Sequence, residues 1–199
     1  MLLNVSLARM KIGLFGGSFD PVHLGHLLAA RAAREEAGLD RMFFIPAAQS
    51  PFKPDAHPAP ATERLRWLRV ALAGDAMAEV DDQEIRRGGP SYTIDTVRDY
   101  ARKFPAAELF YLIGADQTSQ LRLWREAGEL ARLVQFLIIP RPGEVLAELA
   151  APFRGRALRG VPLGVSSSEI RARLKAGLLV THLTPPAVAE ALGNNRLYF

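Results

Sequence analysis

The stretch from Gly13 to His26 constrains the fold and chemistry of this chain more than any other part of the sequence. It begins in an apolar run, 10–15, which predicts a buried strand, and continues into a Gly16-Gly17-Ser18 turn. His23 and His26 then stand at the start of a predicted helix. A strand, a glycine-rich turn and a helix N-terminus can together hold a phosphate through backbone N–H groups. Two histidines directly after such a turn therefore favour phosphate chemistry.

Strand-like and helix-like segments alternate along the remainder of the chain. Short apolar runs at 42–46, 108–113 and 134–140 predict buried strands, and the stretches between them predict helices. The weaker segments 79–85 and 156–165 are also expected to be strands. This alternation predicts an α/β fold, a Rossmann-like doubly wound parallel sheet with helices on both faces.

The 199 residues are expected to form a single domain. Residues 10–165 would make up the Rossmann-like core, and 166–199 a small C-terminal helical part that opens on a capping box from Ser166 to Glu169. A helix is also expected over 144–151.

Four segments with polar or glycine-rich sequence follow predicted strands or open a predicted helix. In doubly wound sheets, ligands bind outside the carboxyl ends of the strands, where the strand order reverses. We therefore expect these segments to lie around one site: 16–26, 47–53, 114–116 and 166–171.

The histidine pair has three possible roles. The imidazoles of His23 and His26 can donate hydrogen bonds to phosphate oxygens as charge develops. A zinc site would need further ligands, yet cysteine is absent and only His57 and His182 remain. The third reading is structural, with both rings capping the helix or packing in the core.

Other candidates are each balanced by a plainer role. Ser166, Ser167 and Ser168 with Arg171 can bind an anion or simply cap a helix. Asp116, after a predicted strand, can accept from a ribose hydroxyl. Lys53 can reach a phosphate or remain solvated, and Trp124 can stack on a ring or pack in the core.

The composition excludes several classes of protein. Hydrophobic residues make up 49% of the chain and cysteine is absent, which excludes disorder, a disulfide framework and a thiol nucleophile. The net charge of +4 is spread along the chain, so no nucleic-acid partner is expected. No apolar run approaches the ~20 residues of a membrane span. We expect a cytoplasmic protein that does not bind membranes, and homo-oligomer formation is left open.

Two motifs carry a family resemblance. Gly16-Gly17-Ser18-Phe19-Asp20-Pro21-x-His23-x-Gly25-His26 and Ser166-Ser167-Ser168-x-Ile170-Arg171 resemble the nucleotidylyltransferase superfamily. The middle of the chain, with Arg86-x-Gly88-x-x-Ser91-Tyr92-Thr93-x-Asp95-Thr96 and Gly114-Ala115-Asp116 followed by Trp124, is similar to the bacterial nicotinate-mononucleotide adenylyltransferase family.

The resemblance implies a reaction in which ATP and nicotinate mononucleotide give deamido-NAD and pyrophosphate. The mononucleotide phosphate would attack the α-phosphate directly, and Mg²⁺ would accompany the ATP phosphates without a metal site of the protein's own. Such a reaction depends on positioning and charge stabilisation rather than on a protein nucleophile.

The resemblance also assigns roles to three groups of residues. The catalytic group is His23, His26 and Arg171. The ATP-binding group is Gly16, Gly17, Ser18, Phe19, Gly114, Asp116, Ile138, Ser167, Ser168 and Ile170, with Ile138 and Ile139 contacting adenine through their backbone. The substrate-binding group is Lys53, Tyr92, Thr93 and Trp124. Phe52 departs from the family pattern, which often has a histidine there, so no role is transferred to it.

Three alternatives stay open. A sibling adenylyltransferase could use phosphopantetheine, although Ser91-Tyr92-Thr93 and Trp124 argue against it. Nicotinamide mononucleotide differs from the nicotinate substrate by one amide in place of a carboxylate. A non-catalytic nucleotide-binding regulator would have no need of His23 and His26.

Overall fold

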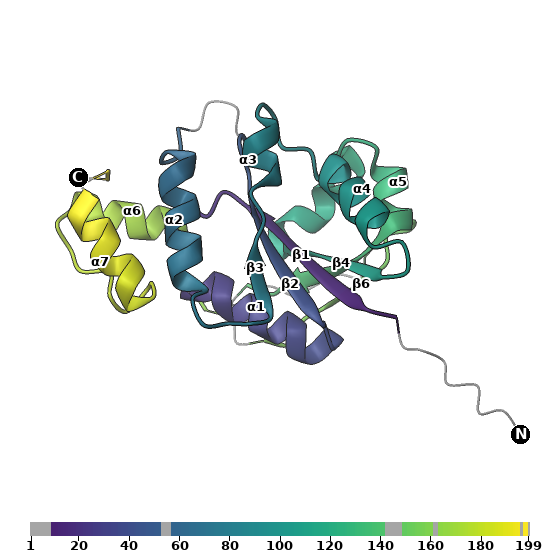
Figure 1. Cartoon of the computed structure of the whole chain (residues 1–199), viewed down its shortest axis with the longest axis horizontal. Helices are drawn as coiled ribbons and strands as arrows, with labels where there is room; N and C mark the ends of the chain where they lie inside the picture. Colours follow the sequence, from purple (N-terminus) through teal and green to yellow (C-terminus); the bar gives the residue numbers. More distant parts are fainter. Residues whose placement is uncertain (1–8, 53–56, 142–148, 161–162, 196, 199) are drawn as a thin grey trace, which may run out of the picture.

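A six-stranded parallel sheet forms the centre of the molecule, with the strand order β3-β2-β1-β4-β5-β6 (Figure 1). The computed structural model describes residues 9–52, 57–141, 149–160, 163–195 and 197–198. The strands are β1 (Lys11–Gly17), β2 (Arg41–Pro46), β3 (Ala78–Val80), β4 (Glu108–Gly114), β5 (Val134–Ile139) and β6 (Gly155–Ala157). This arrangement confirms the predicted Rossmann-like fold class.

Helices connect the strands and extend the chain beyond them. They are α1 (Leu24–Ala37), α2 (Ala61–Ala71), α3 (Gln83–Arg87), α4 (Thr93–Lys103), the 3₁₀ helix η1 (Ala115–Leu123), α5 (Ala127–Leu133), α6 (Ser167–Lys175) and α7 (Pro186–Asn195). Figure 1 shows α1 on one side of the sheet and α4 and α5 on the other, with α6 and α7 gathered beside α2.

The alternation of side chains along each strand produces two cores, one on each face of the sheet. Phe15 of β1 belongs to the core covered by α1, α2, α6 and α7, which also contains Phe44 and Trp67. Leu14, its neighbour, belongs to the opposite core, which α4, η1 and α5 cover. Because parallel strands are buried on both faces, their sequences read as continuous apolar runs.

The strand order reverses between β1 and β4. The chain moves outward from β1 through β2 to β3, returns to β4 on the other side of β1, and then moves outward again through β5 to β6. The register places Leu14 of β1 opposite Phe43 of β2 and Tyr111 of β4. This reversal puts the switch point of the sheet at the carboxyl ends of β1 and β4, where ligands bind in folds of this kind.

Two of the predicted strands are wrong in extent. In the region predicted as a strand over 79–85, only Ala78–Val80 is extended, and the chain turns into α3 at Gln83. The cause is local, because the Asp81 carboxylate accepts from the Gln83 backbone N–H at 3.0 Å and so competes with the strand ladder. Among the described residues of 156–165, which leave out 161 and 162, the strand is confined to β6, Gly155–Ala157. The expected helix over 144–151 lies mostly outside the described residues.

In the described part of the chain, no helix is long and apolar enough to cross a bilayer.

Candidate active site

The chain leaves β1 through a tight turn that brings the histidines back to the sheet. Phe19 adopts a left-handed conformation, φ 47°, which is rare for a side chain of its size. Its ring is buried against Phe15 and Phe44, and this packing holds the unusual backbone in place. The Phe19 side chain therefore lies in the core, and only its backbone could take the predicted ATP-binding role.

Arg64 of α2 holds this turn in place through hydrogen bonds to backbone carbonyls. Arg64 is 2% exposed, and its guanidinium donates to the carbonyl oxygens of Ser18, Ala47 and Ala59 at 2.7 to 2.9 Å. Burial lowers the pKa of Arg64, an effect that the nearby Asp20 and Tyr198 oppose. One side chain thus joins the loops after β1 and β2 to the start of α2.

His23 and His26 form a stacked pair at the N-terminus of α1. Their ring centroids lie 3.6 Å apart with an interplanar angle of 26°. The His23 backbone N–H donates to Nδ1 of His26 at 3.2 Å, which places the proton of a neutral His26 on Nε2. Nδ1 of His23 is buried and has no hydrogen-bond partner among the described residues.

Gly25 explains the spacing of the histidine motif. A Cβ at this position would lie 3.0 Å from Nδ1 of His23 and 3.1 Å from its Cε1, tighter than side chains usually tolerate. A glycine between the two histidines therefore lets the His23 ring fold back over the first turn of α1.

Both imidazoles are expected to be neutral at pH 7 because the pKa of each is lowered. Burial, followed by the positive charge of Arg141, lowers the pKa of His23 to about 4. Burial also lowers the pKa of His26, with further contributions from His23 and Arg141. A neutral ring in this position can donate a hydrogen bond to an anion, and an arriving phosphate would raise the pKa of both rings.

The N-terminus of α6 lies against the histidine turn. Ser166 caps the helix, because its Oγ accepts from the Glu169 backbone N–H at 3.1 Å, which confirms the serine half of the capping box. The hydroxyl of Ser167 donates to the Pro21 carbonyl at 2.9 Å, and Arg171 Nη1 donates to the Asp20 carbonyl at 2.8 Å. The residues predicted to bind phosphate also hold the turn in place.

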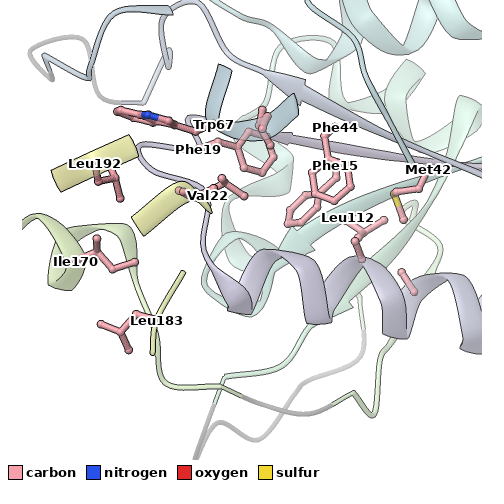
Figure 2. Packing of buried hydrophobic residues seen from close by; sticks show 14 of the residues in the cluster. Phe15, Phe19, Val22, Met42, Phe44, Trp67, Leu112, Ile170, Leu183 and Leu192 are labelled. Carbon is pink, nitrogen blue, oxygen red and sulfur yellow. The ribbon is translucent and has the colours of Figure 1, made fainter. Parts of the chain in front are cut away.

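Ser168 and Ile170 complete this helix start in different ways. Ser168 is exposed and its Oγ accepts from Nη2 of Arg171 at 3.1 Å. Ile170 is fully buried in the core beside Val22 and Leu192 (Figure 2). Its side chain therefore anchors α6, and only its backbone could take the predicted ATP-binding role.

Asp116 and Arg141 extend from the carboxyl ends of β4 and β5. Nη2 of Arg141 lies 3.2 Å from Oδ1 of Asp116, and both side chains are about half exposed. A Cβ on Gly114 would lie 2.4 Å from that same oxygen, so the glycine leaves room for the carboxylate. The predicted nucleotide residue Asp116 is thus linked to the histidines through Arg141, whose positive charge lowers the pKa of both rings.

Ile138 and Ile139, the two residues assigned to adenine, differ in their accessibility to a ligand. The Ile138 carbonyl accepts from the Leu158 backbone N–H at 2.9 Å, and its side chain is buried. Ile139, at the end of β5, lines a small pocket with Gly25 and Ala29 of α1. Of the two positions assigned to adenine, Ile139 is the more accessible.

A second group of predicted residues gathers at the N-terminus of α4. The Tyr111 hydroxyl accepts from the Thr93 hydroxyl at 3.4 Å, and a Cβ on Gly16 would lie 2.1 Å from the same Tyr111 oxygen. Trp124, after η1, packs edge-on against Tyr111 at 6.1 Å between ring centroids. Tyr92 caps α4 and lies under the guanidinium of Arg125 at 4.6 Å. This group therefore adjoins the glycine turn after β1.

Phe52 joins this aromatic group although the sequence assigned it no role. Its ring centroid lies 5.9 Å from that of Trp124, and about half of its surface is exposed. The loop that carries it is pinned to the start of α4, because Ala48 N–H donates to Ser91 Oγ and Ser91 N–H to the Gln49 carbonyl. Lys53, the next residue, lies outside the described residues.

A buried carboxylate supports the same segment. Glu84 of α3 is 4% exposed and accepts from the Thr96 hydroxyl at 2.5 Å. Burial raises its pKa, although hydrogen bonds from Thr96 and Ser91 partly offset the effect. Glu84 thus ties α3 to the first turns of α4.

The structure adds Arg64, Arg141 and Glu84 to the residues that the sequence singled out. Arg141 could have been found, because a cation directly after an apolar strand stands at the carboxyl edge of the sheet. Arg64 and Glu84 lie in ordinary helical patterns, and only their burial distinguishes them. Within the described ranges, no cluster of three or more His, Asp and Glu side chains could hold a metal ion.

Comparisons with known proteins identify the family of this chain. The cytidylyltransferase-like family profile matches residues 14–173. The chain is 44% identical over 191 residues to the "Probable nicotinate-nucleotide adenylyltransferase" of Opitutus terrae, covering 95% of this chain and 98% of that protein. It is 44% identical over 189 residues to a protein of the same name from Thermus thermophilus, covering 95% of this chain and 100% of that protein.

A solved structure shows the same fold at low sequence identity. The Plasmodium falciparum nicotinic acid mononucleotide adenylyltransferase complexed with NaAD matches with a TM-score of 0.81 and 17% identity, over 96% of this chain and 98% of that one. Taken with the family profile and the two bacterial relatives, the evidence shows that the chain belongs to the nicotinate-nucleotide adenylyltransferase family of cytidylyltransferase-like enzymes.

Proposed function

We propose that this protein transfers AMP from ATP to nicotinate mononucleotide, giving deamido-NAD and pyrophosphate. The observation that carries the proposal is the stacked pair His23 and His26 at the switch point of the sheet. The buried Nδ1 of His23 has no hydrogen-bond partner in the described part of the chain. The relatives that share 44% identity over nearly the whole chain carry the name of this activity.

In the proposed reaction, an oxygen of the mononucleotide phosphate attacks the α-phosphorus of ATP. The bond from that phosphorus to the bridging oxygen of the β-phosphate breaks, and pyrophosphate leaves. Nε2–H of His26 would donate to the α-phosphate, where negative charge shifts during transfer, and Arg171 would bind the leaving phosphates. The protein supplies donors and positive charge, and no covalent enzyme intermediate is needed.

Mg²⁺ would enter the site bound to the phosphates of ATP. Asp20, the acidic residue of the turn, already accepts from Ala59 N–H and faces Arg171 and Tyr198. It is therefore occupied by donors rather than presented to a cation. The donor set thus fits an ion held chiefly by phosphate oxygens, as is common for Mg²⁺.

Nicotinate mononucleotide, the acceptor, would bind beside the aromatic side chains Phe52 and Trp124. The N-terminus of α4 presents the backbone N–H groups of Thr93 and its neighbours, which suit the nicotinate carboxylate. Trp124 and Phe52 offer ring faces for the pyridine. An amide in place of the carboxylate would lose the charge-assisted part of this interaction, so nicotinamide mononucleotide should be the poorer acceptor.

A parallel turnover assay tests the proposal. The native protein is offered ATP and Mg²⁺ with nicotinate mononucleotide, nicotinamide mononucleotide or phosphopantetheine, and pyrophosphate release is measured. We expect a clear preference for nicotinate mononucleotide. A preference for phosphopantetheine would place the protein in the sibling activity, and no release with any acceptor would favour a non-catalytic nucleotide-binding regulator.

The histidine pair gives a second test. His26→Ala should leave ATP binding largely intact but cost about 2–4 kcal/mol of transition-state stabilisation, measured as the fall in kcat/KM. Since His26 packs against Phe15 and Phe19, circular dichroism must show that the variant is folded. His182→Ala, at an exposed position, is the matched control. Normal turnover by folded His26→Ala would refute the proposed role.

We further propose that the protein acts in the cytoplasm on ATP and the mononucleotide alone, without a nucleic-acid partner. The spread of positive charge along the chain supports this. Whether it forms a homo-oligomer is decided by light scattering at several concentrations.

A further inference from the structure

Tyr198, near the C-terminus, contacts the turn after β1. Its hydroxyl donates to Oδ1 of Asp20, which lies 178 positions earlier in the chain. The ring is 8% exposed and packs on Trp67 of α2, with 5.9 Å between ring centroids. Figure 2 shows Trp67, Phe19, Val22 and Leu192 in this region, where the turn after β1 meets the C-terminal helix.

Asp20 is the point at which several parts of the chain meet. Oδ1 accepts from Tyr198 and also from the Ala59 backbone N–H at 2.9 Å. Oδ2 lies 3.6 Å from Nη1 of Arg171, beyond hydrogen-bond distance, while the same Nη1 donates to the Asp20 carbonyl at 2.8 Å. Arg171 therefore rests beside the carboxylate without forming a two-pronged ion pair with it.

This incomplete pairing matters for Arg171. An arginine next to a carboxylate tends to form two parallel hydrogen bonds, one to each oxygen. Two other donors already occupy Oδ1 of Asp20, so that arrangement is blocked. Nη2 of Arg171 remains on Ser168 Oγ, at the N-terminus of α6, and the side chain stays about one-third exposed.

We propose that Tyr198 is a positioning residue for the ATP site. By donating to Asp20, it keeps Arg171 from closing onto the carboxylate. The guanidinium N–H groups that are not bonded to the Asp20 carbonyl or to Ser168 then stay available to the triphosphate. It also fastens the end of the chain to the turn that carries His23. Burial and the hydrogen bond to Asp20 raise the pKa of Tyr198, so the hydroxyl keeps its proton and remains a donor. This inference rests on the proposed function, since it assigns ATP to the switch point of the sheet.

Tyr198→Phe tests the inference because it keeps the ring on Trp67 and removes only the hydroxyl. We expect the KM for ATP to rise about tenfold, which corresponds to about 1.4 kcal/mol, while the KM for nicotinate mononucleotide changes less than about twofold. The double variant Tyr198→Phe/Asp20→Asn provides the rescue. A neutral amide no longer attracts Arg171, so the KM for ATP should move back toward the native value.

Equilibrium titration with a non-hydrolysable ATP analogue separates this inference from the proposed reaction. Weaker analogue binding by Tyr198→Phe, with recovery in the double variant, supports the positioning role even if the acceptor is not nicotinate mononucleotide. Unchanged analogue affinity in a folded Tyr198→Phe variant would overturn it. A loss of thermal stability with both KM values unchanged would also overturn it, because that result indicates a purely structural hydroxyl.

Discussion

At the scale of single residues, the site depends on groups that the fold keeps uncharged or unpaired. His23 is 7% exposed, and burial lowers its pKa to about 4. Nδ1 of the same ring has no partner among the described residues. A buried polar atom without a partner is unfavourable, and it is retained here at the position where a phosphate is proposed to bind.

The lowered pKa of His23 predicts an acid-sensitive fold. The unfolded chain takes up the proton near pH 6.5, whereas the folded protein does so only near pH 4. Stability is therefore full above about pH 6.5 and falls as the pH drops toward 4, by about 3 kcal/mol for this residue. Urea unfolding of the native protein and of His23→Gln across this range measures the effect.

The substitution should make the dependence of unfolding free energy on pH less steep. Part of the slope will remain because the pKa of His26 is lowered as well. His182→Gln, at an exposed position, should keep the native slope. Identical slopes for His23→Gln and the native protein would contradict the prediction.

At the scale of elements, β1 and β4 approach each other where the two substrates are proposed to meet. The gap between Gly16 and the Tyr111 hydroxyl leaves no room for even one methyl group, since a Cβ would lie 2.1 Å from the oxygen. Glycine is thus required here for close packing rather than for a positive φ. The Tyr111 hydroxyl also accepts a hydrogen bond from the Thr93 hydroxyl, so Tyr111 links the turn after β1 to the segment that begins α4.

Gly16→Ala should lower the free energy of unfolding by about 1–3 kcal/mol, because the added methyl group overpacks the strand pair. Adding Tyr111→Phe removes the clashing oxygen and should restore much of that loss. Gly128→Ala is the control, since nothing lies within 4 Å of its Cβ and alanine suits the α5 helix better. Strictly additive losses in the double variant would contradict the proposed clash.

The N-terminus of α6 offers a second prediction at this scale. Ser166→Ala removes the acceptor for the Glu169 N–H and should cost about 1 kcal/mol of stability, measured by thermal denaturation. Ser168→Ala, on the exposed side of the same turn, should change stability by less than about 0.5 kcal/mol. Equal losses in the two variants would show that the cap contributes nothing specific.

At the scale of the whole molecule, the site is held together by contacts between distant segments. The turn after β1 is bound by Arg64 of α2, by Ser167 and Arg171 of α6, and by Tyr198 at the end of the chain. The backbone N–H of Leu24 also donates to the Leu183 carbonyl at 2.9 Å. The C-terminal helical part is therefore a structural component of the site.

Arg64 is the most exacting of these contacts. Arg64→Met would leave the carbonyls of Ser18, Ala47 and Ala59 without their donor, and should cost about 3 kcal/mol or more in urea unfolding. Arg64→Lys keeps the positive charge but cannot donate to all three carbonyls in the same geometry. Its unfolding free energy should therefore lie between those of the native protein and Arg64→Met.

Arg66→Met is the matched control. Its side chain is 64% exposed and lies 3.8 Å from Glu63, so its loss should cost less than about 0.5 kcal/mol. If Arg64→Met were as stable as Arg66→Met, the buried guanidinium would have no role in joining the loops.

The sequence alone determined the fold class, and it predicted which turn binds phosphate. Apolar runs alternating with helical stretches predicted the parallel sheet, because strands covered on both faces must be apolar throughout. The glycine turn and the histidines after β1 then predicted where phosphates bind, because the carboxyl ends of such strands carry the ligands. These signals are local in the chain, so a linear reading can detect them.

Only the tertiary structure decided how the site is held and which side chains remain available to ligands. Ile170 belongs to a binding motif, yet it is buried. Arg64 and Glu84 stand in sequence patterns typical of surface helices, yet Arg64 holds the loops after β1 and β2 and Glu84 holds the start of α4. Phe52 meets Trp124 from a distant part of the chain. Tyr198 reaches Asp20 from the far end. Burial and pairing across such separations depend on packing, and no local sequence pattern encodes them.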